Sequence, residues 1–533
     1  MTNARLTLFC KALFERAPYL SAFTLGALMA LAFAPVYFLP GIIISLWGLM
    51  INLDQATTIR HMIQRLYVFG LGFFLAGMHW VGFAFRAADM GWVGVPAAIL
   101  LASILSFFLI PIAFFITPFK PKTIERRLAF AVGFAVCEWL RGHLFTGLPW
   151  NLAGSIWGTG TFYTHDIGLS ILQSTAWIGV YGLSFLTILA AILITDSHRF
   201  LRNSTCFLFI ILSAFGIYRL KHTPTDVHSN ITIRLVQPCI EQRLKWVPGK
   251  LESNIKRHMN LSVLEAKRPL SAIIWPEAAV PMLLNTSADA QRMLAQIIPS
   301  NGILLTGASR KENKNLYTGL SVLNEKGDII HSYDKTHLVP FGEYVPFKQF
   351  LPVEKITPGA IDFTAGKGIE TVSPSNIPPF SPLICYEALF PGEVVQSPSA
   401  TYMSATHLTK RPAEHPAKRP EWLLNLTNDA WYGRSSGPYQ HLALTRLRAI
   451  EEGLPLIRAA NNGISAVIDA NGRILYKLGL DDVGFIDFEL PKPLKTTFYS
   501  HYKEIPYWAM LIIIMGIAIA LRRKQDVRKK NIE

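Results

Sequence analysis

Cys385 is the first candidate for chemistry, because it ends an apolar run in Pro382-Leu383-Ile384-Cys385-Tyr386-Glu387. A break from strand to loop at this point can present the thiol to a cleft. A nucleophilic cysteine reacts as the thiolate, so it needs a neighbouring base or cation that lowers its pKa from about 8.5. An isolated cysteine in an apolar run is more commonly a small buried residue. Residues elsewhere in the chain therefore decide which interpretation applies.

A carboxylate and a lysine could supply the base and the cation. Glu277 ends the apolar run Ile273-Ile274-Trp275-Pro276-Glu277, and Lys335 lies in Tyr333-Asp334-Lys335-Thr336-His337. Considered separately, a carboxylate at a strand end is equally consistent with a surface position, and a lysine in a hairpin is usually solvated. A carboxylate can remove a thiol proton, and a fixed cation can stabilise charge on an attacked carbonyl oxygen. The three residues together would suit acyl transfer through a cysteine thioester.

Glu277, Lys335 and Cys385 follow the chain order of the glutamate, lysine and cysteine of the carbon-nitrogen hydrolase, or nitrilase, superfamily. The stretch from Asn230 to Pro491 resembles that superfamily. The resemblance implies an αββα sandwich in this stretch. It also implies that Glu277 is the general base, that Lys335 stabilises the oxyanion and that Cys385 is the nucleophile.

The whole chain resembles the apolipoprotein N-acyltransferase family, which completes bacterial lipoprotein maturation. The segments that carry this wider resemblance are Gln237-Pro238 through Lys245-Trp246, Phe341-Gly342-Glu343-Tyr344-Val345-Pro346, Asn428-Asp429-Ala430-Trp431-Tyr432-Gly433, Asn461-Asn462-Gly463-Ile464-Ser465, Glu138-Trp139-Leu140-Arg141 and Gly147-Leu148-Pro149-Trp150. The resemblance implies a ping-pong reaction in which Cys385 takes an acyl chain from a phospholipid, typically phosphatidylethanolamine. The N-terminal α-amine of an S-diacylglyceryl-cysteine apolipoprotein then accepts that chain.

Four further residues match family positions around the three. Glu343, Tyr386 and Glu387 are expected to support the geometry or the charge of the site. Glu387 is also consistent with a carboxylate satisfied by backbone or cationic partners. Trp246 resembles a family tryptophan on a mobile arm over the site, and it is equally consistent with an anchor at the membrane interface.

Long apolar runs predict a membrane protein. Hydrophobic residues make up 51% of the 533 residues, and the mean hydropathy is +0.30. A helix needs about 20 residues to cross the hydrocarbon core of a bilayer. About eight runs approach this length: Tyr19 to Phe38, Gly41 to Leu53, Leu66 to Phe85, Val93 to Phe119, Leu128 to Phe145, Ile171 to Ile194, Cys206 to Tyr218 and Tyr507 to Leu521. Glu138 and Arg141, one turn apart in the fifth run, could form a structural pair or serve function.

The distribution of lysine and arginine predicts the orientation, because cytoplasmic loops retain these residues. The residues expected to be cytoplasmic are Arg5, Lys11, Arg16, Arg60, Arg65, Lys120, Lys122, Arg126, Arg127, Arg199, Arg202, Arg522, Arg523, Lys524, Arg528, Lys529 and Lys530. Arg219 and Lys221 run against this trend. The pattern predicts a bacterial inner-membrane protein with cytoplasmic termini and a periplasmic catalytic domain. The net charge of +15 then serves topology and anionic lipid, so nucleic-acid binding is not expected.

The expected organisation is a seven-helix transmembrane domain at 1–221, a nitrilase-like periplasmic domain at 229–491, and a transmembrane helix with a basic tail at 504–533. The fold class is therefore a membrane all-α bundle plus an αββα sandwich. Strands are expected at Ile231 to Val236, Ala272 to Trp275, Ile303 to Thr306, Leu383 to Cys385 and Trp422 to Leu426; helices at Ser287 to Ile298 and Pro438 to Glu452; and hairpin turns at Asn324 to Gly327 and Asp469 to Gly472. Residues Ser397 to Pro420 lack apolar periodicity and are expected to form a loop or disordered insertion.

The cysteine spacing gives no metal site and no disulfide framework, so neither a metal nor a cofactor is expected. The five cysteines are Cys10, Cys137, Cys206, Cys239 and Cys385. Two other functions remain open. A membrane-tethered amidase or nitrilase would discharge the same thioester to water, but a soluble amide gives no reason for eight spans. A transporter with a ligand-binding exported domain would show inverted repeats with broken spans, and no such duplication is evident in the sequence.

Overall fold

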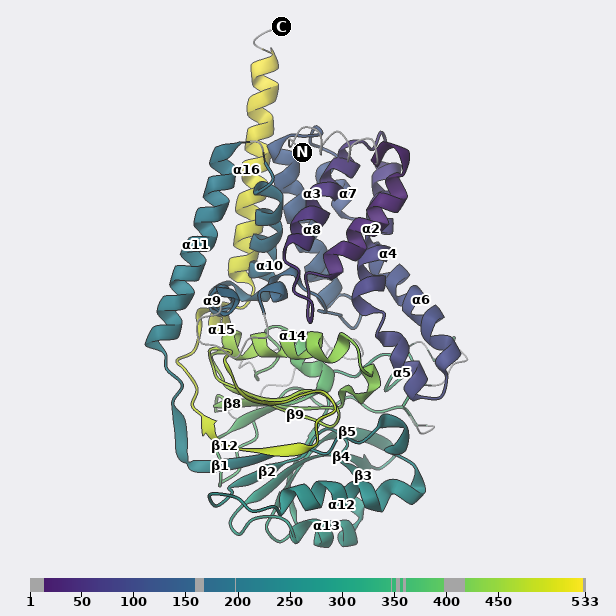
Figure 1. Cartoon of the computed structure of the whole chain (residues 1–533), viewed down its shortest axis with the longest axis vertical. Helices are drawn as coiled ribbons and strands as arrows, with labels where there is room; N and C mark the ends of the chain where they lie inside the picture. Colours follow the sequence, from purple (N-terminus) through teal and green to yellow (C-terminus); the bar gives the residue numbers. More distant parts are fainter. Residues whose placement is uncertain are drawn as a thin grey trace. The chain divides into compact units, whose positions relative to one another are not determined.

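The structure is a computed structural model that describes residues 14–158, 167–196, 198–346, 348–350, 355–357, 361–396 and 418–530 (Figure 1). It divides into two compact units. The helical unit comprises Met1–Gly82, Val93–His222 and Thr497–Glu533, and the sandwich unit comprises Phe83–Trp92 and Thr223–Thr496. Each unit is described separately below.

The helical unit consists largely of apolar helices, and three of them begin with a residue that favours a helix start. Its main helices are α2 (Pro18–Ala30), α3 (Pro40–Asp54), α4 (Ile59–Met78), α6 (Gly94–Ser106), α7 (Ile112–Ile116), α8 (Ile124–His143), α9 (Ile167–Leu172), α10 (Thr175–Leu193), α11 (Arg199–His222), α15 (Phe498–Tyr502) and α16 (Ile505–Lys530). Proline occupies the first turn of α2 and α3, where its missing N–H leaves no hydrogen bond unmade. The Thr58 side chain caps α4 by accepting a hydrogen bond from the N–H of His61.

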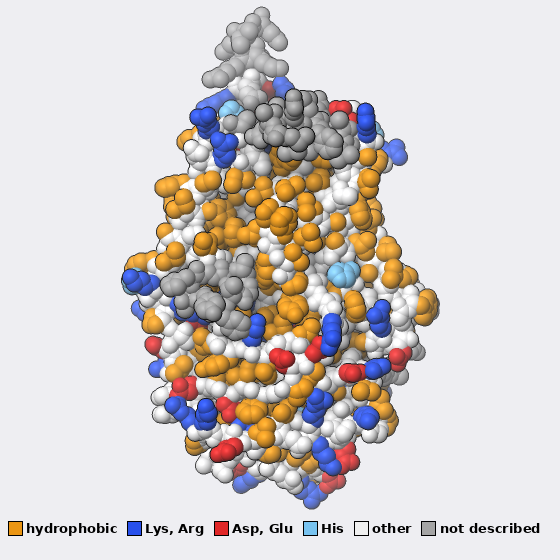
Figure 2. Space-filling view, viewed as in Figure 1, with side chains coloured by type: hydrophobic (Ala, Val, Ile, Leu, Met, Phe, Trp, Pro, Cys, Tyr) orange, Lys and Arg blue, Asp and Glu red, His pale blue; other side chains and the backbone are white. Residues whose placement is uncertain are grey.

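Four helices in the described ranges are long and apolar enough to cross a membrane by length and composition: Gly91–Ile116, Thr175–Leu193, Arg199–His222 and Ile505–Val527. Helix α4 and the following α5 (Val81–Ala87) would make a fifth as a bent pair. Hydrophobic side chains cover much of the visible surface of this unit (Figure 2). Leu100, Ile210 and Ile512 are among its exposed large hydrophobic residues. Several apolar helices are therefore present, while the count of eight spans stays a prediction.

Two of the predicted spans are interrupted. The run from Leu66 to Phe85 forms α4 and α5, which are bent by 47° at the break between them. The run from Ile171 to Ile194 is divided between α9 and α10, and Gly179 inside α10 has φ 65° and ψ 175°. A Cβ at Gly179 would lie 2.3 Å from the ring of Tyr499, so close packing as well as backbone conformation requires glycine there. Apolarity alone did not reveal either break.

Described residues from two of the basic segments predicted to be cytoplasmic, at the start of α8 and in α16, lie at one end of the helical unit. Asp54, at the end of α3, forms an ion pair with Arg126 of α8 at 2.8 Å. Arg127 pairs with Asp196, which follows α10. Arg522 of α16 lies over the ring of Phe119, 5.8 Å from its centroid. Loops rich in lysine and arginine alternate along the sequence with loops poor in them. The contacts above place basic residues from such loops at the same end of the helical unit.

The sandwich unit contains two sheets. Its strands are β1 (Val227–Gln237), β2 (Ala272–Ile274), β3 (Val280–Leu283), β4 (Ile303–Glu312), β5 (Asn315–Asn324), β6 (Ile329–Asp334), β7 (Phe380–Ile384), β8 (Trp422–Thr427), β9 (Leu456–Ala460), β10 (Ser465–Ile468), β11 (Ile474–Leu478) and β12 (Gly484–Pro491). The first sheet has the order β12-β1-β2-β4-β5-β6, with β3 beside β4, and the second has the order β11-β10-β9-β8-β7. The parallel pairs are β1–β2, β2–β4, β3–β4, β7–β8 and β8–β9. The antiparallel pairs are β1–β12, β4–β5, β5–β6, β9–β10 and β10–β11.

Helices cover the outer faces of the two sheets, which gives four layers in the order αββα (Figure 1). Helices α12 (Leu251–Ser262) and α13 (Ala288–Ala295) lie outside the first sheet, and α14 (Gly437–Glu452) lies outside the second. On β2, Ile274 belongs to the core between the sheets, and Ile273 belongs to the core under the helices. Successive strand residues point to opposite faces. Strands covered on both faces therefore need the continuous apolar runs seen in the sequence.

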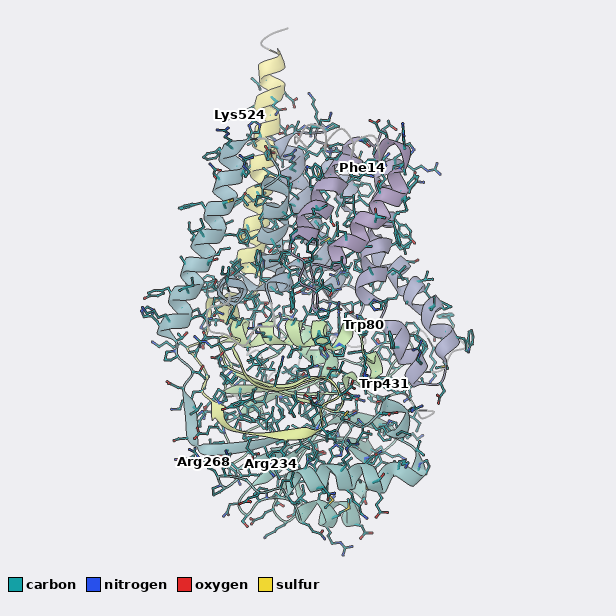
Figure 3. The ribbon with its side chains drawn as sticks, viewed as in Figure 1. Phe14, Trp80, Arg234, Arg268, Trp431 and Lys524 are labelled. Carbon is teal, nitrogen blue, oxygen red and sulfur yellow. The ribbon has the colours of Figure 1, made fainter. Side chains whose placement is uncertain are left out.

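One buried charge interrupts the apolar run of β1. Arg234, labelled in Figure 3, is fully buried, and its Nε and Nη2 each donate to the carboxylate of Asp487 at 2.7 Å. Asp487 is its cross-strand partner on β12. The guanidinium also lies 4.1 Å from the ring centroid of Phe485. This paired charge fixes the register of β1 against β12.

Most predicted elements of this unit are confirmed. Each expected strand overlaps an observed one, both hairpin turns join antiparallel partners, and Gly453 ends α14 in the left-handed conformation. The prediction that Cys385 ends a strand is wrong by one residue, because β7 ends at Ile384 and Cys385 begins a 3-10 turn. Most of the predicted insertion, residues 397–417, lies outside the described residues.

Candidate active site

Cys385 lies at a sharp bend between β7 and the 3-10 turn η7 (Cys385–Leu389). Its φ is 51°, in the left-handed region that side chains other than glycine rarely adopt. The residue is 7% exposed and contributes to the core between the sheets. Strain of this kind persists only where surrounding contacts impose it.

Lys335 follows β6, and its N–H donates to the carbonyl of Thr318 on β5 at 2.8 Å. Its side chain is 1% exposed, with Nζ donating to Glu343 Oε1 at 2.7 Å and lying 3.7 Å from Glu277 Oε1. Burial opposes the charged ammonium, but Glu343 and Glu277 outweigh it and raise the pKa of Lys335 above its ordinary value. The ammonium is therefore a permanent cation within the site.

Glu277 follows β2, and the main chain around it packs against Gly307 of β4, where a Cβ would lie 2.6 Å from the Glu277 Cα. Its side chain is 12% exposed. Burial raises the pKa of Glu277, while Lys335 lowers it and Glu343 raises it further. A carboxylate of raised pKa is a better proton acceptor than an ordinary surface carboxylate, which suits a general base.

The Cys385 thiol is protonated in this environment. Burial raises its pKa to about 12, Glu277 acts in the same direction, and Lys335 opposes both. A resting thiolate is therefore disfavoured, and attack on a carbonyl requires removal of the proton as the reaction proceeds. Glu277 is the carboxylate with the largest effect on the pKa of this thiol, so it is the first candidate for the base.

Glu343 holds the cation in place. One of its oxygens accepts from Lys335 Nζ, and the other accepts from the N–H of Val339 at 2.8 Å. The carboxylate thus bridges the lysine to the turn that follows β6. The same Nζ lies farther from Glu277 Oε1, at 3.7 Å.

Glu387 is satisfied mainly by the backbone, the alternative that the sequence left open. It accepts from the N–H of Ile384 at 2.7 Å and from the N–H groups of Thr336 and His337 at 2.6 and 3.1 Å. Tyr333 Oη also donates to it at 2.8 Å. These bonds join the bend at Cys385 to the segment that carries Lys335. Burial raises the pKa of Glu387 to about 7 against this set of donors.

Tyr386 and Trp246 lie in different surroundings. Tyr386 is buried, and its ring packs edge-on against Phe390 with centroids 5.0 Å apart. Trp246 is half-buried and lies just after the 3-10 turn η4 (Gln242–Leu244). The structure therefore brings Tyr386 next to the nucleophile, while the role of Trp246 stays a prediction.

Lys245 is a site residue that was not predicted individually. It is 3% exposed, and its Nζ donates to the main-chain carbonyl of Glu277 at 2.9 Å. Burial lowers the pKa of Lys245 to about 8, with Glu277 and Cys385 opposing the shift. A single lysine in a polar segment carries no signal of burial. The contact between Lys245 and the Glu277 carbonyl is seen only in the structure, where the segment with Lys245 lies over the end of β2.

No group of three or more His, Cys, Asp or Glu side chains in the described ranges could hold a metal ion. Four of the five cysteines are described, and all four are free thiols. The chemistry that can be read from the site is that of one thiol, its carboxylates and its ammonium groups.

Known proteins with the same pattern identify the family. Residues 232–492 match the carbon-nitrogen hydrolase family, and residues 25–193 match the apolipoprotein N-acyltransferase N-terminal domain. Apolipoprotein N-acyltransferase of Rhodopseudomonas palustris is 36% identical over 491 residues, which cover 86% of this chain and 85% of that protein. The chain belongs to the apolipoprotein N-acyltransferase family. The family relative of Rickettsia bellii is 33% identical over 523 residues, covering 95% of this chain and 98% of that protein.

Among solved structures, an amidase from Nesterenkonia sp. matches at 17% identity with a TM-score of 0.35, covering 50% of this chain and 93% of that chain. Membership of the apolipoprotein N-acyltransferase family makes this chain an acyltransferase of lipoprotein maturation. Its carbon-nitrogen hydrolase region contains the buried thiol, carboxylates and ammonium groups described above.

Proposed function

We propose that this acyltransferase moves a fatty acyl chain from a phospholipid to the N-terminal α-amine of an S-diacylglyceryl-cysteine apolipoprotein through a thioester on Cys385. The observation that carries the proposal is the arrangement around Lys335, whose Nζ contacts Glu343 and Glu277 beside the buried thiol. A base, a cation and a nucleophile are the groups that acyl transfer requires. Family membership adds the class of donor and acceptor.

In the first half-reaction, Glu277 takes the proton of the Cys385 thiol while the sulfur attacks the ester carbonyl of the donor. Lys335 stabilises the negative charge on the carbonyl oxygen. The tetrahedral intermediate collapses by breaking the ester C–O bond. The leaving lysophospholipid oxygen takes the proton from Glu277, which becomes ionised again.

In the second half-reaction, the neutral α-amine of the apolipoprotein attacks the thioester carbonyl. Glu277 accepts the proton that the amine loses, and Lys335 again stabilises the oxygen. The C–S bond breaks, and the departing sulfur recovers the proton from Glu277. The products are an amide and the free thiol, so the enzyme returns to its starting state.

The remaining residues support this reaction in distinct ways. Glu343 anchors the Lys335 ammonium, and Glu387 ties the bend at Cys385 to the segment after β6. Tyr386 packs beside the nucleophile, and the proposed place of Trp246 is on an arm over the site. Phosphatidylethanolamine is the proposed donor.

The proposed location is the bacterial inner membrane, with eight spans, cytoplasmic termini and the catalytic domain in the periplasm. The position of two basic segments at one end of the helical unit supports this orientation, because cytoplasmic loops retain lysine and arginine. Membrane attachment suits a reaction in which both substrates keep their acyl chains in the bilayer. It holds the enzyme and its substrates in the same membrane, so they need not meet by diffusion through solution.

A two-substrate assay tests the proposal. Purified protein in vesicles is incubated with phosphatidylethanolamine and a diacylglyceryl-cysteine peptide, and products are measured by mass spectrometry. Equal amounts of lysophospholipid and N-acyl peptide, both absent with Cys385→Ala, are expected. Lysophospholipid with free fatty acid and no N-acyl peptide would instead establish a hydrolase.

A further inference from the structure

A buried polar cluster lies behind Cys385 and takes no part in the reaction described above. Its members come from four neighbouring elements: Asn425 from β8, Asp429 from η8 (Asp429–Tyr432), His441 from α14 and Arg458 from β9. Asn425, Asp429, His441 and Arg458 are each 0% exposed. Burying so many polar groups is costly unless every group is bonded. Trp431, labelled in Figure 3, marks the position of η8.

The cluster makes two contacts with the main chain of Cys385. His441 Nε2 lies 3.3 Å from the Cys385 carbonyl oxygen. Asn425 Nδ2 donates to the same oxygen at 3.3 Å and to the Leu383 carbonyl at 3.1 Å. The carbonyl of the nucleophile is therefore held from two different elements, α14 and β8.

The other members hold the two donors in place. Arg458 Nη1 donates to Asn425 Oδ1 at 2.5 Å, which turns the amide nitrogen toward Cys385. Asp429 Oδ1 lies 2.9 Å from His441 Nδ1, and Asp429 Oδ2 accepts from Arg458 Nη2 at 2.6 Å. Arg458 and His441 hold the pKa of Asp429 at about 2 even though burial opposes its ionisation. Asp429 is thus a permanent anion that orients both partners.

The ring of His441 can donate to Cys385 in either form that carries a proton on Nε2. In the neutral tautomer, Nδ1 accepts from Arg458 Nη2, which lies 3.1 Å away. In the imidazolium, Nδ1 carries a proton, so it donates to Asp429 and no longer accepts from Arg458. Both of these forms place an Nε2–H on the Cys385 carbonyl oxygen.

We propose that His441 and Asn425, oriented by Asp429 and Arg458, are positioning residues that clamp the Cys385 carbonyl. The φ of 51° at Cys385 is unfavourable for a residue with a side chain, and the peptide bond that follows is planar. Holding the carbonyl oxygen at two points fixes the plane of that peptide. The clamp therefore keeps the strained conformation that directs the thiol toward Glu277 and Lys335. This role rests on the proposed function of Cys385 as nucleophile.

Four variants test the clamp. His441→Ala removes one donor, and His441→Gln retains an amide nitrogen that can reach the position of Nε2. Asn425→Asp keeps an acceptor for Arg458 but removes the donor to Cys385. The matched control is Thr445→Val, one turn along α14, because Thr445 is buried and its hydroxyl donates only to the His441 carbonyl among the bonds described.

Two measurements are made on each folded variant, with folding checked by thermal unfolding. The first gives kcat and KM for acyl transfer from phosphatidylethanolamine to the peptide. The second gives the rate at which iodoacetamide alkylates Cys385, read from the mass of the peptide that contains it. This second measurement reports the placement of the thiol without any lipid reaction.

The clamp predicts that His441→Ala and Asn425→Asp lower kcat roughly 10- to 100-fold with KM nearly unchanged, because a displaced nucleophile costs rate more than binding. Cys385 alkylation slows in parallel, His441→Gln recovers most of both rates, and Thr445→Val resembles wild type. Wild-type rates in folded His441→Ala, or equal losses in Thr445→Val, would overturn the clamp. If His441→Ala does not fold, the test rests on Asn425→Asp. Wild-type kcat and a wild-type alkylation rate in folded Asn425→Asp would then overturn the clamp. Slower alkylation in the variants of a protein that shows no acyl transfer would refute the proposed function and leave the clamp standing.

Discussion

The central residues of the site combine a thiol with a high pKa and a cation that cannot lose its proton. Burial dominates the behaviour of Cys385, and the anionic Glu277 adds to it. Lys335 opposes both effects but is itself shared between Glu343 and Glu277. Proton transfer and attack must therefore occur together, which protects the resting thiol from reaction with other electrophiles.

Replacement of Glu277 should separate thiol acidity from catalysis. In Glu277→Gln, the negative charge that raises the thiol pKa is removed, so the pKa of Cys385 should fall below about 12. Acyl transfer should nevertheless fall by roughly 100-fold or more, because the base is lost. The thiol pKa is read from the pH dependence of Cys385 alkylation. Asp289→Asn, an exposed change on α13, is the control. An unchanged thiol pKa would contradict the assigned electrostatics.

Lys245 should set the acid limit of the activity. Glu277 must be ionised to act as base, and Lys245 lowers its pKa. Removing that cation in Lys245→Met should raise the pKa of Glu277 and move the acid limb of the kcat/KM profile to higher pH. Lys245 has a pKa of about 8, so it is charged throughout that limb and the comparison is valid there.

The same profile measured for Lys250→Met provides the control for Lys245, since Lys250 is exposed in the same segment. Lys245→Arg should retain a profile closer to wild type. An acid limb that does not move in Lys245→Met would show that the lysine serves only to pack the main chain of Glu277.

At the scale of elements, the two sheets place the reactive residues at strand ends that meet. Glu277 follows β2, Lys335 follows β6 and Cys385 follows β7. Three short loops after these strands therefore position the three side chains. In the helical unit, two charged side chains of α8 likewise hold a loop in place. Glu138 of α8 accepts from the N–H of Ala153 at 2.9 Å, and Arg141 donates to the carbonyls of Leu148 and Trp150, each at 2.6 Å.

Arg141→Met should destabilise the helical unit. The substitution keeps much of the side-chain volume but leaves the Leu148 and Trp150 carbonyls without this donor inside the unit. Loss of a buried charged donor should lower the melting temperature in detergent by roughly 5 to 10 °C. Arg60→Met, an exposed change at the start of α4, should leave it unchanged. A wild-type melting temperature in Arg141→Met would assign this arginine a role other than anchoring the segment after α8.

The strands of the sandwich unit could be predicted because their apolar runs are bounded by turn residues, as at Asn324 and Gly327. The short strand β3 gave no clear pattern, since its pairing with β4 rather than its own residues determines it. Glu277, Lys335 and Cys385 were found through a resemblance of three motifs. Lys245 and His441 were not, because their partners lie at 32 and 56 residues' separation. Such contacts exist only once the sheets have formed.

At the scale of the whole molecule, one chain combines an apolar helical unit with a sandwich unit that carries the thiol. The helical unit exposes large apolar side chains, among them Phe207 and Ile513, whereas charged residues are interspersed over the visible surface of the sandwich unit (Figure 2). An aqueous hydrolase has no need of the first unit. An acyltransferase of lipoprotein maturation, whose substrates carry acyl chains, has a use for an apolar unit in the same chain.

The account depends most on a thioester at Cys385, and intact-mass analysis tests it directly. Wild-type and Cys385→Ala protein are incubated with phosphatidylethanolamine, washed, and then given a diacylglyceryl-cysteine peptide. The account predicts one acyl adduct on wild type alone, released by hydroxylamine and discharged onto the amine of the peptide. An equal adduct on Cys385→Ala, or N-acyl peptide formed by that variant, would contradict it.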